Sequence, residues 1–185
     1  LGQLKHQQEK GLRSVVFTFV PSPAAFFSRE TIQELSTLEE KRRIFQNAGV
    51  DYLVEYPFYR EIADMEPETF IREVLVNRIR AKCVVAGEDV SYGRQGAGDY
   101  QLLRRLAPEY GYDVILIDKV LYEGREVSST YVREQVGKGS MELAAALLGS
   151  PYQVSGEIIH GRKLGRTIGM PTVNLLPPQD KLLPP

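Results

Sequence analysis

The stretch RSVVFTF, Arg13 to Phe19, is β-branched and almost continuously apolar. A strand of this composition is expected to be buried on both faces, as in a parallel sheet covered by helices. Three later runs are also predicted to be strands: VDYLVEYPF (Val50 to Phe58), KCVVAG (Lys82 to Gly87) and YDVILIDKVLYEG (Tyr112 to Gly124).

Helical patterns separate these strands. The spacing of apolar residues predicts helices over Ser36 to Ala48, from Pro67 to about Ile79, over Asp99 to Tyr110, at Ser129 to Val136 and at Met141 to Leu148. Strands that alternate with helices of this length indicate βαβ units, so the fold class is α/β with a parallel sheet. Leu1 to Lys10 reads as a helix without a capping residue, which predicts a further element upstream.

One helix carries a dense run of charges. Ser36 followed three residues later by Glu39 predicts a capping box. Glu39 and Glu40, with the basic run Lys41 to Arg43, are expected to form a solvated helix face.

The hydrophobic pattern and the composition of the chain change after Gly149. PYQVSGEIIHG, Pro151 to Gly161, alternates like an exposed antiparallel strand, and glycines and prolines crowd the remainder. We therefore predict one domain over residues 1–149 and the beginning of a second over 150–185. The second stretch is too short to hold a core alone, so we expect it to be incomplete.

Composition narrows the function classes. The 23 basic and 24 acidic residues nearly cancel, which argues against generic binding to nucleic acid or to anionic membranes. The single cysteine, Cys83, excludes an intramolecular disulfide and is expected to be an inert core residue. His6 and His160 are far apart, so no zinc-ligand spacing exists. No apolar run approaches the ~20 residues of a membrane helix, and a cytoplasmic location is the default expectation.

Two segments that follow predicted strands could bind an anion. GEDVSYGRQGAGD, Gly87 to Asp99, has four glycines that permit close backbone approach to a ligand, but it fits a flexible surface loop equally well. In VSSTYVREQV, three hydroxyl residues sit where a helix should begin, and Arg133 follows one turn later. A helix start favours phosphate, although serine and threonine are also simply good N-caps.

Two further segments give weaker evidence for ligand binding when each is taken alone. TFVPSP, Thr18 to Pro23, leaves the first strand and reads more readily as a plain loop. HGRKLGRTIGMPTVN, His160 to Asn174, suits either a phosphate-facing loop or the turns of a β-barrel.

Taken together, these segments resemble the bacterial bifunctional riboflavin kinase/FMN adenylyltransferase family, the FAD synthetases. The resemblance covers nearly the whole chain, in the order SVVFTFVPSP, STLEEK, GVDYLVEYPF, GEDVSYG, VSSTYVR, LLGSPYQVSGEIIHG and GRTIGMPTVNLLPP. SSTYVR indicates the wider nucleotidyltransferase superfamily, whereas GRTIGMPTVN is specific to the riboflavin kinase module. The resemblance implies a Rossmann-like nucleotidyltransferase domain with a parallel sheet, followed by the start of an antiparallel riboflavin kinase β-barrel.

The resemblance also assigns site residues. Ser128, Ser129, Thr130 and Arg133 match the motif that holds the ATP phosphates, and Arg133 and Ser129 are the expected catalytic residues. Gly87, Asp89 and Gly93 match a loop that lines the nucleotide and flavin pocket, in which Tyr92 replaces the usual phenylalanine. Thr172 and Asn174 match a motif that coordinates Mg²⁺ and ATP phosphate.

The implied activities are transfer of AMP from ATP to FMN, giving FAD and pyrophosphate, and phosphorylation of riboflavin to FMN. The substrates and products are ATP, FMN, FAD and riboflavin, with Mg²⁺ as cofactor and no nucleic-acid or membrane partner. The family's HxGH-type motif would precede Leu1 and its catalytic glutamate would follow Pro185, so both active sites are expected to be incomplete within this sequence. Two rival interpretations remain: an adenylyltransferase for nicotinamide or pantetheine phosphates, and a non-catalytic fragment that binds nucleotide or flavin.

Overall fold

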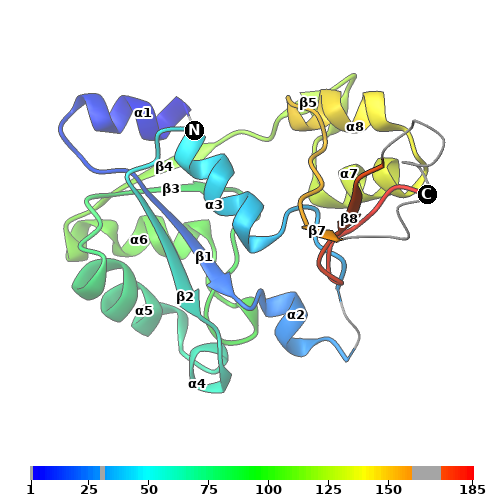
Figure 1. Cartoon of the computed structure of the whole chain (residues 1–185). Helices are drawn as coiled ribbons and strands as arrows, with labels where there is room; N and C mark the ends of the chain where they lie inside the picture. The colour runs from blue at the N-terminus through cyan, green and yellow to red at the C-terminus, as the bar shows by residue number, and fades with distance from the viewer. Residues whose placement is uncertain (1, 30–31, 160–171) are drawn as a thin grey trace. The chain divides into compact units, whose positions relative to one another are not determined.

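The four predicted strands form two parallel pairs. In the computed structural model, which describes residues 2–29, 32–159 and 172–185, β1 (Val15–Val20) pairs with β2 (Tyr52–Pro57), and Val15 lies opposite Tyr52. Strand β3 (Cys83–Gly87) pairs in parallel with β4 (Asp113–Ile117), and Cys83 lies opposite Asp113 (Figure 1). The α/β class with parallel strands is therefore confirmed.

The chain divides into two compact units. Unit 1 consists of Leu1–Arg29 and Phe45–Val120, and unit 2 consists of Glu30–Ile44 and Leu121–Pro185. Unit 1 contains both parallel strand pairs, and its helical segments are α1 (Gly2–Glu9), α2 (Pro23–Phe27), α4 (Arg60–Ala63), α5 (Pro67–Phe70), the π-helix η1 (Ile71–Arg78), the short η2 (Arg94–Gly96) and α6 (Tyr100–Tyr110).

The core of unit 1 joins the strands to these helices. Ile71 and Val74 of η1 are fully buried, and Leu103 of α6 is nearly so. Aromatic rings extend this core: Phe17 meets Phe70 edge to face with the ring centroids 5.8 Å apart. Such ring pairs add to the free energy gained from apolar burial.

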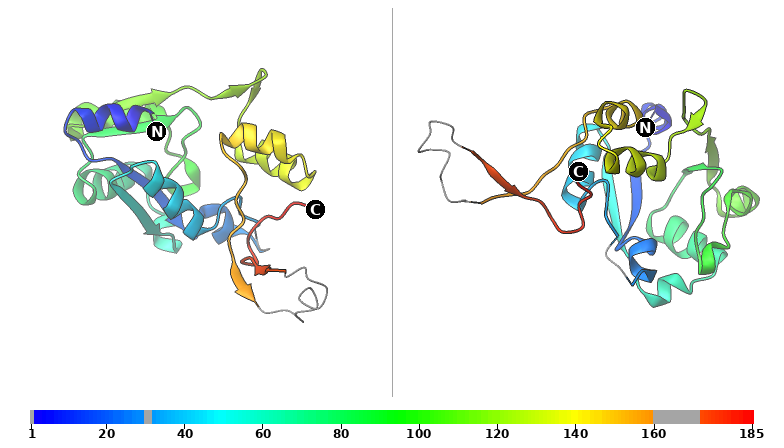
Figure 2. Two further views of the ribbon diagram at one scale, coloured as in Figure 1. Left: turned by 45° about the horizontal axis from the view of Figure 1, so that its top comes forward. Right: turned by 90° about the vertical axis from the view of Figure 1, so that its right-hand side faces the viewer.

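Unit 2 is built on helices with two small antiparallel hairpins. Helix α3 (Leu38–Asn47) belongs to it up to Ile44, and α7 (Ser129–Gly137) lies beside α8 (Met141–Leu148) in both views of Figure 2. Val132, Val136, Ala144 and Leu147 are the buried core between α7 and α8. The hairpins pair β5 (Leu121–Tyr122) with β6 (Arg125–Glu126), and β7 (Glu157–Ile159) with β8 (Asn174–Leu176).

The predicted strand Tyr112 to Gly124 is wrong in its second half. β4 ends at Ile117, and the β5–β6 hairpin follows after a break. The turn of that hairpin consists of Glu123 and Gly124, both with positive φ (50° and 81°). Because two successive residues with positive φ form the tight hairpin turns, the chain reverses at the end of the predicted strand.

The capping box of α3 lies one residue later than predicted. Thr37 Oγ1 accepts a hydrogen bond from the Glu40 N–H at 3.2 Å, and Glu40 Oε2 accepts one from the Thr37 N–H at 3.0 Å. Both residues are buried, with Glu40 1% exposed. The expected solvated face is therefore wrong for Glu40, because its carboxylate has partners from elsewhere in unit 2.

Candidate functional site

Helix α7 begins where the sequence predicts a helix start. Ser128 is the N-cap in extended conformation, and its Oγ accepts a hydrogen bond from the Tyr131 N–H at 3.2 Å. Ser129 and Thr130 form the exposed first turn. The N–H groups of a first turn have no partner inside the helix and carry the positive end of its dipole, so they can bind a phosphate oxygen.

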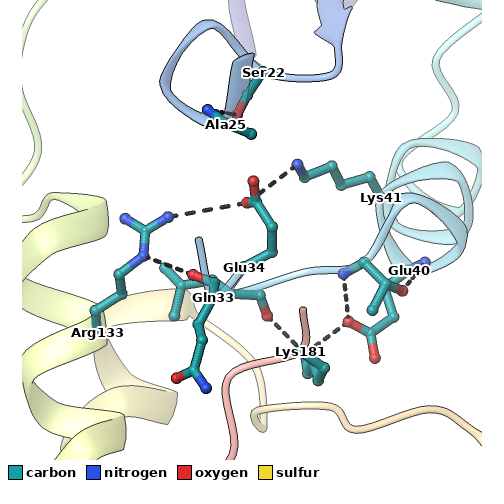
Figure 3. Close-up of polar contacts among 10 residues, drawn as sticks. Ser22, Ala25, Gln33, Glu34, Glu40, Lys41, Arg133 and Lys181 are labelled. Carbon is teal, nitrogen blue, oxygen red and sulfur yellow. Dashed lines mark hydrogen bonds and ion pairs between the residues drawn. The ribbon is translucent and has the colours of Figure 1, made fainter. Parts of the chain in front are cut away.

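Arg133 projects from the next turn of α7. Its Nε donates a hydrogen bond to the Gln33 carbonyl oxygen at 3.3 Å, and its Nη2 lies 3.9 Å from Glu34 Oε2 (Figure 3). The side chain is 38% exposed. The guanidinium is therefore oriented by the backbone of residue 33 and remains accessible to a ligand.

The backbone of Glu34 forms hydrogen bonds with residues near the C-terminus. Its N–H donates to the Asp180 carbonyl at 2.6 Å, and its carbonyl accepts from the Leu182 N–H at 2.9 Å. The segment that orients Arg133 is thus paired with residues about 150 positions later in the sequence.

A buried ion pair anchors this pairing. Lys181 Nζ lies 2.7 Å from Glu40 Oε2, and both side chains are 1% exposed. Lys181 also donates to the Leu35 carbonyl at 2.6 Å and lies 4.3 Å from the centre of the Tyr152 ring. Three favourable contacts compensate the desolvation of this ammonium.

The pKa values of Glu40 and Tyr152 reflect this environment. Burial would raise the pKa of Glu40, but the Lys181 ammonium and the Thr37 N–H outweigh it and hold the pKa below its ordinary value. Burial raises the pKa of Tyr152 to about 12, and the negative charge of Glu40 adds to that shift. At neutral pH Glu40 is therefore a carboxylate and Tyr152 a neutral phenol.

The Gly87–Asp99 loop belongs to unit 1 and has a defined conformation. Tyr92 and Gly98 exchange two backbone hydrogen bonds, 3.1 and 2.8 Å long. The Tyr92 ring is buried, and its hydroxyl donates to the Asp99 carbonyl at 3.1 Å. Burial raises the pKa of this phenol above its usual range. Tyrosine is accommodated here because its hydroxyl finds an acceptor in the Asp99 carbonyl.

Gly93 is required by this loop. Its φ is +72°, and a Cβ at this position would lie 2.7 Å from Pro67 Cα. Asp89, in contrast, is largely exposed, and its carboxylate lies 4.0 Å from Lys119 Nζ. Gly93 therefore shapes the loop, whereas Asp89 is accessible to a ligand.

The predicted site residues fall into two groups. Gly87, Asp89 and Gly93 lie in unit 1, and the residues of α7 lie in unit 2. That they line one pocket stays a prediction. A surface hollow of unit 1 contains none of them and is lined by Glu66, Pro67, Glu68, Thr69, Arg72, Leu102 and Arg105.

Thr172 and Asn174 are exposed, and Asn174 opens β8 opposite Ile159. The preceding part of their motif, residues 160–171, lies outside the described residues. Among the residues described, no group of three histidine, cysteine or acidic side chains could hold a metal ion, and no helix is long and apolar enough to cross a bilayer.

No local sequence pattern marks Gln33, Glu34, Lys41 or Lys181 as residues near Arg133. Thr37 and Glu40 do show the spacing of a capping box. No local pattern links them to Lys181, because that contact is formed only in the folded unit.

Two family profiles match the chain. The profile of FAD synthetase matches residues 2–131, and that of riboflavin kinase matches residues 148–185.

Several curated relatives are named bifunctional riboflavin kinase/FMN adenylyltransferase. The protein of Escherichia coli (strain K12) is 35% identical over 175 residues, which cover 94% of this chain and 56% of the relative. The protein of Listeria monocytogenes is 36% identical over 178 residues, covering 95% of this chain and 56% of the relative. The chain thus spans a little more than half the length of these relatives.

A solved structure is also similar. A crystal structure described as a macrolide-efflux protein from Streptococcus pneumoniae superposes with a TM-score of 0.83 at 28% sequence identity. The match covers 97% of this chain and 59% of the other.

Proposed function

The chain belongs to the FAD synthetase family, and we propose that the protein transfers AMP from ATP to FMN, giving FAD and pyrophosphate. The observation that carries the proposal is the Ser128-capped start of α7 with Arg133 one turn later. Free first-turn N–H groups and an accessible guanidinium are suited to a polyphosphate.

The chemistry needs no covalent intermediate. An oxygen of the FMN phosphate attacks the α-phosphorus of ATP, a new P–O bond forms, and the bond to the β-phosphate oxygen breaks so that pyrophosphate leaves. We assign the first-turn N–H groups, the Ser129 hydroxyl and Arg133 to the phosphates, where they stabilise the charge that grows on the leaving group.

The predicted residues of unit 1 have a separate role in this proposal. Gly93 holds the loop that follows β3 in place, and the exposed Asp89 is available to substrate. We propose that Gly87, Asp89 and Gly93 line the nucleotide and flavin pocket.

The C-terminal part is proposed to begin a riboflavin kinase module. The boundary at residues 149–150 is supported by the riboflavin kinase profile, which starts at residue 148, and the antiparallel β7–β8 pair is consistent with the first strands of a barrel. This module would phosphorylate riboflavin to FMN. Both reactions use substrates of the bacterial cytoplasm, where we place the protein.

Mg²⁺ is part of this proposal. Thr172 and Asn174 offer two neutral oxygen atoms on an exposed segment at the start of β8, a donor set that suits Mg²⁺ when phosphate oxygens and water complete the shell. When bound, the ion would neutralise phosphate charge.

The proposal is tested by incubating the full-length protein with ATP and FMN and by following FAD and pyrophosphate. We expect both in equal amounts, and FMN formation when riboflavin replaces FMN. Product from nicotinamide mononucleotide or phosphopantetheine, but not from FMN, would favour the rival adenylyltransferases. Binding of FMN and ATP without turnover would favour a binding protein.

A further inference from the structure

One carboxylate oxygen lies between two cationic side chains in unit 2. Glu34 Oε2 is 3.9 Å from Arg133 Nη2 and 3.6 Å from Lys41 Nζ (Figure 3). Both distances exceed hydrogen-bond length, so the carboxylate acts on the two cations mainly through its charge.

The two cations remain accessible although they are paired. The side chains of Arg133 and Lys41 are 38% and 34% exposed. Loose pairs of partly exposed groups contribute little to stability. The Glu34 carboxylate is therefore not needed to orient Arg133, which is the role of the Gln33 carbonyl.

Glu34 can give up these contacts without disturbing the fold. Its backbone N–H and carbonyl are both paired, to Asp180 and Leu182, so only the side chain must rotate. The buried pair of Lys181 and Glu40 keeps this backbone in place.

We propose that Glu34 is an internal counter-ion that occupies one anion position between Arg133 and Lys41 and yields that position to a phosphate group of ATP. This inference rests on the proposed function, and it adds Lys41 as a second phosphate-binding cation. The triphosphate chain of ATP carries several negative charges and therefore displaces a single carboxylate, whereas a neutral ligand does not. The arrangement thus selects for ligands that bear phosphate.

The test is the dissociation constant of the ATP–magnesium complex, measured by titration calorimetry on the full-length protein. Glu34→Gln keeps the size of the side chain and removes its charge, so ATP should bind about three- to tenfold more tightly. Lys41→Gln should weaken binding about threefold.

Two controls match these variants. Glu39→Gln removes a carboxylate from the same helix that carries Lys41, and Lys138→Gln removes an exposed ammonium that pairs with Glu134. Neither should change the dissociation constant. In a chain with Arg133→Ala and Lys41→Gln together, Glu34→Gln should no longer tighten binding.

Each outcome decides between the alternatives. Unchanged or weaker binding in Glu34→Gln, or tightening that persists without the two cations, would overturn the inference. Tighter ATP binding by Glu34→Gln in a protein that makes no FAD would support the inference and overturn the proposed function. Absence of ATP binding in every variant would overturn both.

Discussion

Glu40 and Lys181 show how strongly the role of one residue depends on a distant partner. Glu40 lies in a run of charged residues that predicts a solvated face, yet its carboxylate is buried against Lys181. The partners are 141 residues apart, so helical periodicity contains no information about the contact. Buried charges of this kind are the part of the site that the sequence alone does not reveal.

The Glu40 carboxylate should make stability depend on pH. Its pKa is lowered in the folded state, so its contribution is present above the ordinary glutamate pKa of 4.5 and is lost as the pH falls through the folded value. Glu40→Gln should be about 3 kcal/mol less stable than the wild type at pH 7, because Lys181 loses its charged partner. Urea unfolding at pH 7, 5, 4 and 3 should show this difference shrinking with acid. A constant difference would contradict the assignment.

A second prediction at the scale of single residues concerns Gly93. Gly93→Ala should destabilise unit 1 by about 2–3 kcal/mol, because an added Cβ is strained at φ +72° and meets the Pro67 backbone. Gly111→Ala is the matched control, since its φ is +70° but nothing lies within 4 Å of its Cβ. It should cost only about 1 kcal/mol. Equal losses in denaturant unfolding would refute the role of Pro67.

At the scale of elements, local patterns predicted the existence of strands and helices better than their ends. The first three strands, the first half of the fourth and the helix starting after Ser128 are where the patterns place them. The errors lie at the ends of elements: residues 118–120 interrupt the last predicted strand, and Thr37 replaces Ser36 as the cap. Hydrophobic periodicity identifies the buried face of a helix or strand, whereas the element ends where particular hydrogen bonds form.

The cap of α7 can be tested directly. Ser128→Ala removes the acceptor of the Tyr131 N–H and should lower the free energy of unfolding by about 1 kcal/mol. Ser140 precedes α8 without a side-chain cap hydrogen bond, so Ser140→Ala should have a much smaller effect. Thermal or urea unfolding of both variants checks the difference, and equal destabilisation would count against the cap.

At the scale of the whole molecule, the two compact units do not follow the boundary between the family profiles. Unit 2 combines α7 with the segment around residue 181, which the riboflavin kinase profile matches. The sequence predicted an α/β domain followed by a different module from composition and motifs. The sequence did not predict that Asp180 and Leu182, which belong to the second module, form backbone hydrogen bonds with Glu34 beside Arg133. Backbone pairing of this kind involves no recognisable side-chain pattern.

The central claim is that Arg133 serves AMP transfer to FMN. The most direct test is kcat/KM for ATP in FAD formation by the full-length protein, compared between wild type, Arg133→Ala and the surface control Arg60→Ala. We predict at least a tenfold loss for Arg133→Ala, equivalent to about 1.4 kcal/mol, and no loss for Arg60→Ala. An unchanged kcat/KM in Arg133→Ala would contradict the account.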